Sequence, residues 1–281
     1  MNALVLGLIA AMCWGFHDIC VRFLSQKTPL TSCIFIVLVT GLVFHLGLMG
    51  FTQEVHALTP RSFWSSIAAG FCFVIATFGL YFAFERGPVR LVAPLIASYP
   101  ILSVLLATLQ GSTATALQWV AVLAIVVGVG LVAALSEDNP DEVPAYGPTV
   151  LFSLISACGF AGTFALGQMA ADLSGELSTT LVTRIMAVAL VIAILLLFKK
   201  PFWPGKSALP WLIAMGIADG VALYVVMSAG ALPSPEIAAV TSSMFGLVTI
   251  VLAWILLKER MTVPQWAGCV VAFVGVGVLA L

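Results

Sequence analysis

Long apolar runs alternate with short polar segments along the whole chain of 281 residues. A helix needs about 20 consecutive, mostly apolar residues to cross the hydrocarbon core of a bilayer. The chain reaches that length ten times, and the segments between the runs are mostly short and turn-like. The pattern therefore predicts ten membrane-spanning helices, at residues 2–24, 31–51, 63–85, 89–109, 116–135, 148–171, 178–198, 209–231, 235–257 and 264–281.

The composition favours a membrane protein over a soluble one. Hydrophobic residues make up 62% of the chain and charged residues only 8%, whereas soluble domains carry roughly 25% charged residues. So few charges cannot cover the surface of a soluble protein of this size. We therefore expect an all-α integral membrane protein that lies in the lipid bilayer as a multi-pass protein of the plasma membrane, such as the bacterial inner membrane.

Other function classes lack the sequence features that they need. The net charge of −1 gives no basic surface for nucleic acid. The six cysteines lie in apolar runs, form no CxxC motif and have no histidine at metal-ligand spacing, so we interpret them as packing residues. No HExxH, GxSxG or paired-acid motif occurs. We expect no cofactor, no bound metal and no enzymatic activity.

The second half of the chain repeats the first at a shift of 147 positions. This shift places Pro88 on Pro235 and Trp119 on Trp266, in one register. Such self-similarity indicates a duplicated unit. The predicted units are a first five-helix repeat at residues 1–136, an acidic, Pro-containing linker at 137–147 and a second five-helix repeat at 148–281.

An odd number of spans in each repeat forces the second copy to lie upside down relative to the first. Two inverted repeats are typical of secondary transporters, which bind substrate near the membrane midplane between them. Gly-Val-Gly runs at Gly128 and Gly275 predict close packing of the fifth and tenth spans, on each other or on a second subunit. A monomer is sufficient for this architecture, and a dimer is the open alternative.

Ten spans place both termini on the same side of the membrane. Lys and Arg favour cytoplasmic loops. Most of the basic residues fall at loops opposite the termini, and Arg61 is the one that clearly falls on the side of the termini. The distribution of positive charge therefore predicts that the termini lie outside.

Ionisable groups inside spans are costly and mark candidate functional sites. In the first span Trp14, His17, Asp18 and Arg22 share one helix face. Asp18 can face a cavity and bind a polar solute or a proton, or it can form an ion pair with Arg22 near the membrane interface. The two interpretations have equal weight for Asp18, whereas the interfacial role is favoured for Arg22.

Polar groups in other spans need a partner in a medium without water. Packing is the commoner role of a buried aromatic stripe, but several polar groups on inward-facing helices predict one shared substrate cavity. The candidate lining residues beyond Trp14, His17 and Asp18 are Thr77, Tyr81, Ser98, Tyr99, Phe160, Phe164, Gln168, Asp219, Tyr224 and Ser242.

The fourth and ninth spans contain features that bend helices. Pro94 and Pro100 predict a bend in the fourth span. The ninth span has a Thr-Ser-Ser run at residues 241–243 instead, which can bend a helix or bind a ligand. We expect structural roles for three further ionisable side chains: extension to the interface for Arg184, packing for His45 and helix capping for Glu236.

The chain resembles the ten-helix EamA-type exporters of the drug/metabolite transporter superfamily. The resemblance rests on two five-helix units with Trp14-Gly15 and Ala161-Gly162 in their first spans, and on the stretch Leu-Lys-Glu-Arg-Met-Thr at residues 257–262, followed by a Gly-rich last helix. The first copy departs from this pattern, with Gly-Ser-Thr at residues 111–113 where the second has Lys-Glu-Arg.

This resemblance implies a carrier that exports small metabolites, most commonly amino acids or related compounds, by alternating access. An efflux carrier for drugs or hydrophobic cations is the alternative, and an intramembrane enzyme or a passive channel is less favoured. Members of the superfamily's small multidrug group carry a proton-coupling acid in their first helix, which Asp18 resembles in kind. The family also implies cytoplasmic termini, against the distribution of positive charge.

Overall fold

The computed structural model describes residues 3–53, 56–109, 115–135, 146–229, 232, 238 and 241–279, except the side chains of 103, 104, 106, 107, 109 and 133. The described residues form helices and connecting turns, and no strand occurs among them. The helices are α1 (Ala3–Ser25), α2 (Leu30–Thr52), α3 (Pro60–Arg86), α4 (Val89–Ala97), α5 (Pro100–Leu109), α6 (Ala116–Ala134), α7 (Tyr146–Ser174), α8 (Glu176–Leu197), α9 (Leu209–Ser228), α11 (Phe245–Leu252), the π-helix η2 (Ala253–Leu257) and α12 (Val263–Leu279).

Six of these helices are long and apolar enough to cross a membrane: α1, α2, α3, α7, α8 and α9. Four shorter apolar stretches accompany them, at Val89–Leu102, Ala116–Val132, Phe245–Leu257 and Val263–Leu279. The structure therefore supports an all-helical protein with several membrane-spanning segments. A full set of ten crossings in two inverted repeats stays a prediction.

The fourth predicted span is broken. Helix α4 ends at Ala97, a turn follows at Ser98 and Tyr99, and α5 begins at Pro100. Proline disfavours helical backbone at the residue before it and has no N–H to donate. The predicted bend is thus confirmed before Pro100, where it divides residues 89–109 into two helices, whereas Pro94 lies inside α4.

A similar turn occurs in the ninth predicted span, at Ser243 and Met244, immediately before α11. Its position agrees with the bend that the Thr-Ser-Ser run predicts. Glu236, expected to cap the start of this span, lies outside the described residues.

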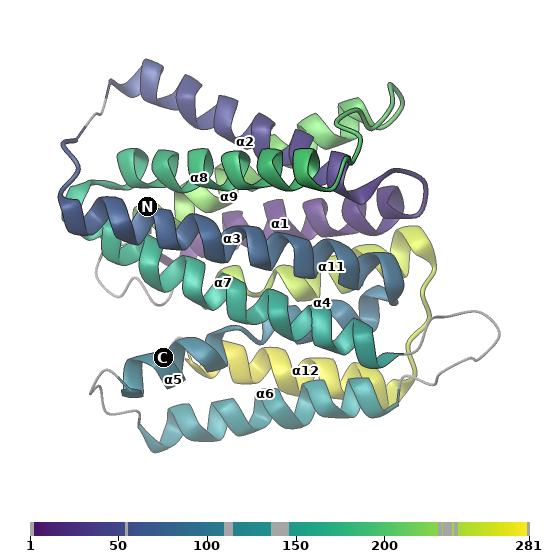
Figure 1. Cartoon of the computed structure of the whole chain (residues 1–281). Coiled ribbons are helices and arrows are strands. Elements are labelled where there is room, and N and C mark those ends of the chain that lie inside the picture. The colour runs from purple at the N-terminus through teal and green to yellow at the C-terminus, as the bar shows by residue number, and fades with distance from the viewer. Residues whose placement is uncertain are drawn as a thin grey trace.

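Contacts between the two halves of the chain occur in matched pairs. Helix α1 packs on α9 and α11, and its counterpart α7 packs on α3 and α5. Helix α2 packs on α9, and its counterpart α8 packs on α3. Two pairs of counterparts, α2 with α8 and α6 with α12, lie against each other (Figure 1). The duplicated sequence therefore forms two halves whose helices pair in corresponding combinations, although α3 and α7 pack far more extensively than α1 and α9.

The α6–α12 pair depends on glycine at two equivalent positions. A side-chain carbon at Gly128 would lie 2.6 Å from the backbone nitrogen of Ala272, and one at Gly275 would lie 2.9 Å from the carbonyl oxygen of Ala121. Both distances are too short for any side chain. The predicted close packing of the fifth and tenth spans on each other is confirmed.

The loop after η2 connects the second half to the start of α4. The two carboxylate oxygens of Glu259 accept hydrogen bonds from the backbone N–H groups of Val89 and Arg90, each at 3.3 Å. The Arg90 guanidinium in turn donates to the carbonyl oxygen of Arg260, at 3.0 Å. A carboxylate at a helix N-terminus satisfies backbone donors that have no partner within the helix.

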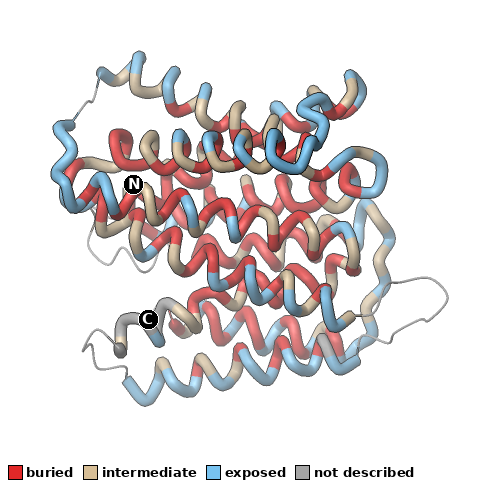
Figure 2. The backbone as a smooth tube through the Cα atoms, viewed as in Figure 1, coloured by how far each residue is buried: buried red, intermediate tan, exposed pale blue. Residues whose placement is uncertain are grey.

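Exposed residues recur along the outer helices (Figure 2). Many of the exposed residues carry large apolar side chains. Leu123, Val127, Leu197 and Trp254 are all more than half exposed. Soluble monomers rarely expose apolar surface of this extent. An outer surface of this kind is stable against lipid, in agreement with the six long apolar helices.

Replacement of Gly128 by Ala is expected to push α6 away from α12 and to destabilise the protein by about 1–3 kcal/mol, the usual range for overpacking. Gly130 provides a matched control on the same helix, because no atom lies within 4 Å of a side-chain carbon built there. Thermal unfolding in detergent should show a lower midpoint for Gly128→Ala and an unchanged or slightly higher one for Gly130→Ala. Equal midpoints for the two variants would contradict the packing described above.

Candidate functional site

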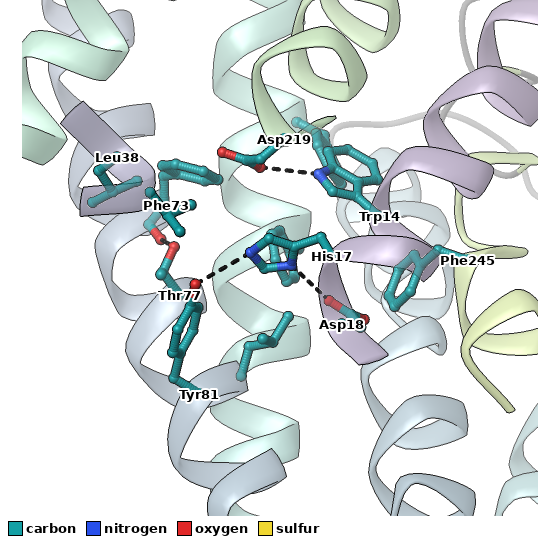
Figure 3. A pocket seen from close by; sticks show the side chains of 13 residues that line it. Trp14, His17, Asp18, Leu38, Phe73, Thr77, Tyr81, Asp219 and Phe245 are labelled. Carbon is teal, nitrogen blue, oxygen red and sulfur yellow. Dashed lines mark hydrogen bonds and ion pairs between the residues drawn. The ribbon is translucent and has the colours of Figure 1, made fainter. Parts of the chain in front are cut away.

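A pocket lies among α1, α2, α3, α7, α9 and α11, and its walls come from both halves of the chain (Figure 3). The cavity between the side chains has a volume of about 20 Å³, so the pocket is nearly closed in this structure. The residues that line it are Trp14, His17, Asp18, Val37, Leu38, Phe73, Thr77, Leu80, Tyr81, Phe160, Phe164, Asp219 and Phe245.

His17 connects two polar side chains of this pocket. Its Nδ1 lies 3.0 Å from Oδ1 of Asp18, and its Nε2 lies 3.3 Å from the hydroxyl oxygen of Tyr81 (Figure 3). Asp18 is 1% exposed, and its second oxygen, Oδ2, has no hydrogen-bond partner among the described residues. A buried polar atom without a partner is rare and needs an explanation.

Asp219 has partners on both carboxylate oxygens. The indole Nε1 of Trp14 donates to Oδ1 at 3.0 Å, and the Arg184 guanidinium donates to Oδ2 at 2.6 Å. Arg184 also donates to the backbone carbonyl oxygen of Asp219, at 3.2 Å. The carboxylate therefore connects α1 of the first half to α8 and α9 of the second.

The prediction that Arg184 extends to the membrane interface is wrong. Its side chain is 0% exposed, and its guanidinium carbon lies 4.8 Å from the centre of the Phe73 ring. A position near the start of a predicted span suggested an interfacial residue. In the fold, α8 packs between α2, α3 and α9, and this turn of the helix is enclosed.

His45, expected to be a packing histidine, is fully buried on α2. Its Nδ1 lies 2.7 Å from the carbonyl oxygen of Gly41, whereas its Nε2 has no partner among the described residues. It does not line the pocket.

Arg22 does not pair with Asp18. Its guanidinium donates instead to the carbonyl oxygens of Phe84 and Glu85, at 2.8 and 3.3 Å. These carbonyls belong to the last turn of α3, where they have no partner within the helix. The C-terminal end of α3 therefore takes the positive charge, and Asp18 is left with His17.

Aromatic rings form much of the pocket wall and the layer behind it. Trp14 lies against Phe164, with ring centres 5.6 Å apart, and Phe160 stacks on Phe164 at 5.9 Å. Tyr99 packs on the same Phe164 ring at 5.1 Å, and its hydroxyl lies 2.7 Å from Oγ of Ser242. Tyr99 and Ser242 thus support the wall without lining the pocket.

Eight of the thirteen candidate residues line the pocket: Trp14, His17, Asp18, Thr77, Tyr81, Phe160, Phe164 and Asp219. The structure leaves the other five outside its lining: Ser98, Tyr99, Gln168, Tyr224 and Ser242. Ser98 donates to the carbonyl oxygen of Leu95 at 2.7 Å, a local bond at the helix break. The amide nitrogen Nε2 of Gln168 is buried without a partner among the described residues.

Six residues at the pocket or its base are not predicted from the sequence as lining residues: Val37, Leu38, Phe73, Leu80, Arg184 and Phe245. Phe73 carries a usable signal, since it precedes Thr77 and Tyr81 by four and eight positions on one helix face. Val37, Leu38 and Leu80 resemble every other apolar residue of their spans, so no signal distinguishes them.

The family model for EamA-like transporters matches residues 1–134 and again residues 147–281. The chain belongs to the EamA-like transporter family. It is therefore a multi-pass membrane protein of a family that transports small molecules.

Two further comparisons show a similar half-length protein and a similar fold. The chain is 25% identical over 129 residues to an uncharacterized protein of Methanocaldococcus jannaschii, a match that covers 46% of this chain and 93% of that protein. That relative is therefore about as long as one half of this chain. A solved crystal structure of a protein with 17% identity has a TM-score of 0.70, over 98% of this chain and 95% of that one, which indicates a shared fold.

Replacement of Arg184 by Met is expected to lower stability by about 3 kcal/mol or more, because it leaves a buried carboxylate without its cation. The double variant Arg184→Met/Asp219→Leu should regain much of this loss, since it removes both charges. Thermal unfolding in detergent measures both effects. Arg61→Met, at an exposed position, is the control and should stay near wild type. A double variant that is no more stable than the single one would argue against the ion pair.

Proposed function

We propose that this protein is a secondary-active or facilitative carrier that exports small metabolites, amino acids or related compounds, by alternating access. Its substrate site is the pocket around Asp18. One observation carries the proposal: a buried carboxylate oxygen without a partner lies in an aromatic-lined pocket whose walls come from both halves of the chain. A ligand is the missing partner.

The arrangement of the two halves supports alternating access. We propose inverted five-helix repeats at residues 1–136 and 148–281, joined by the linker at 137–147. The matched contacts between equivalent helices agree with such repeats. Two similar halves in opposite orientations can exchange conformations, which turns a pocket open to one side into a pocket open to the other.

The chemistry of the pocket suits a small amphipathic solute. Aromatic rings can cover an apolar body, and the few polar groups among them can fix its orientation. Tyr81, His17 and Asp18 form a continuous polar strip on one side of the space. Asp18 is the group expected to hold the positively charged or hydrogen-bond-donating end of the solute.

The same polar strip can hold a proton. A neutral His17 can donate from Nδ1 to Asp18 and accept from Tyr81 at Nε2, and a protonated His17 can donate to both. The positions of the heavy atoms fit either state. A proton can therefore enter this pocket without the loss of a hydrogen bond, which supports coupling of transport to protons.

Efflux of hydrophobic cations is the second candidate function. It is favoured by the same free carboxylate oxygen together with the aromatic rings of Trp14, Phe160, Phe164 and Phe245. A cation gains energy over the face of an aromatic ring, most of all over tryptophan. The two functions differ in the solutes that the protein exchanges.

Counterflow in proteoliposomes tests the proposal, with one panel of amino acids and amines and another of hydrophobic cations. Accumulation of a labelled solute, driven by the same unlabelled solute inside, is expected for wild type. Asp18→Asn should reduce the initial rate by about tenfold or more, because the carboxylate is lost from the pocket. Asp172→Asn, at an exposed position, is the matched control and should retain the rate. Equal rates in the two variants would remove Asp18 from the site.

Coupling to protons predicts that an imposed pH gradient changes the uphill flux of the exported solute. The proton then competes with the solute for the His17–Asp18 pair. The measurement is uptake into proteoliposomes with and without the gradient, with the membrane potential clamped by valinomycin and potassium. The same rate under both conditions would leave a uniporter driven by the solute gradient alone.

A further inference from the structure

The charges at the pocket do not balance. Two carboxylates, those of Asp18 and Asp219, lie in its walls, and one guanidinium, that of Arg184, lies directly behind. Arg184 is fully buried, and both oxygens of Asp219 are already bonded, to Arg184 and Trp14. Asp219 and Arg184 therefore form a neutral pair, in which Nε of Arg184 has no partner among the described residues. When His17 is neutral, Asp18 is the carboxylate that remains to be compensated.

The positive groups near the pocket are not available to a ligand. The Arg184 guanidinium donates twice to Asp219, stacks on Phe73 and does not line the pocket. The other guanidinium on this side of the fold, that of Arg22, is held by the end of α3. A carboxylate in the pocket would thus find no free cation among the described residues.

The hydrogen-bond donors of the lining are also engaged. The Trp14 N–H donates to Asp219, and the Thr77 hydroxyl donates to the carbonyl oxygen of Phe73 at 2.7 Å. Both ring nitrogens of His17 have partners. In contrast, Oδ2 of Asp18, an acceptor that is buried in the pocket wall, has none among the described residues. A ligand that brings a positively charged hydrogen-bond donor would therefore satisfy the free acceptor of the lining.

We propose that the pocket selects organic amines: molecules with one ammonium group, an aromatic or aliphatic body and no carboxylate. The ammonium donates to Asp18, and the body lies among the aromatic rings once the helices around the nearly closed pocket have moved apart. With His17 neutral, the Arg184–Asp219 pair keeps the net charge of the site at −1. Arg184 and Asp219 thus act as positioning residues that set the charge preference. This inference rests on the proposed carrier function and, within the class of small metabolites, favours amines over amino acids.

Three probes with the same aromatic body test the preference for charge. They are phenethylamine, a cation; phenylalanine, a zwitterion; and 3-phenylpropionate, an anion. Binding of each labelled probe to the purified wild-type protein is measured by equilibrium dialysis at neutral pH. We expect phenethylamine to bind about tenfold or more tightly than phenylalanine, and 3-phenylpropionate not to bind, since an added carboxylate meets Asp18 and no free cation.

A charge-balance series of variants tests the role of the pair. Asp219→Asn leaves Arg184 uncompensated, so phenethylamine should bind about tenfold more weakly although Asp18 is intact. The affinity for phenylalanine, divided by the affinity for phenethylamine, should rise in this variant. The reason is that phenylalanine carries a carboxylate, which the uncompensated Arg184 guanidinium attracts. Asp219→Asn/Arg184→Gln restores the net charge of −1 and should recover both amine binding and the wild-type ratio. Asp172→Asn is again the control.

The outcomes separate this inference from the proposed function. Tighter binding of phenylalanine than of phenethylamine by wild type overturns the amine preference and leaves a carrier for amino acids in place. Binding of none of the three probes also overturns it, while counterflow with the broader panels still tests transport. A double variant that folds, as judged by gel filtration, but stays as weak and as unselective as Asp219→Asn rejects charge compensation by the pair. The wild-type comparison does not depend on the stability of any variant.

Discussion

The carboxylate of Asp219 is the interaction on which the centre of this structure depends. It takes the indole N–H of Trp14 from the first half and the guanidinium of Arg184 from the second, and all three groups are buried. In a membrane interior no water can replace a missing partner, so each group fixes the position of the other two. The contact between α1, α8 and α9, and with it the base of the pocket, follows from this constraint.

The scaffold around that centre is nearly symmetric, but the chemistry on it is not. The shift of 147 positions that relates the two halves carries His17 onto Phe164, Val37 onto Arg184 and Cys72 onto Asp219. The matched helix contacts preserve the framework of the two halves, whereas His17, Arg184 and Asp219 each occur in one half only. Duplication thus supplied the architecture, and divergence of a few positions supplied the polar groups of the pocket.

Two helix ends bind charged side chains that lie outside the pocket. Arg22 is bound by the last carbonyls of α3, and Glu259 by the first N–H groups of α4. Both charges are satisfied by backbone groups that a helix leaves without partners at its ends. These charges are therefore kept out of the pocket, which leaves the His17–Asp18 pair and the Arg184–Asp219 pair to determine its electrostatics.

The sequence by itself determined the positions of the apolar helices, the duplication, the family and the residue types with which a site can be built. Hydrophobic runs and the shift of 147 positions are properties of the chain, and helical spacing correctly put Trp14, His17 and Asp18 on one face. Spacing describes one helix at a time, so it could not say that Asp18 pairs with His17, that Arg184 turns inward to Asp219, or that Tyr99 lies behind Phe164. Arg184 and Asp219 lie on different helices, and Tyr99 and Phe164 come from different halves of the chain, so only the packing of the helices decides that they meet. His17 and Asp18 are neighbours on α1, and Asp18 is left with His17 because the end of α3 takes Arg22.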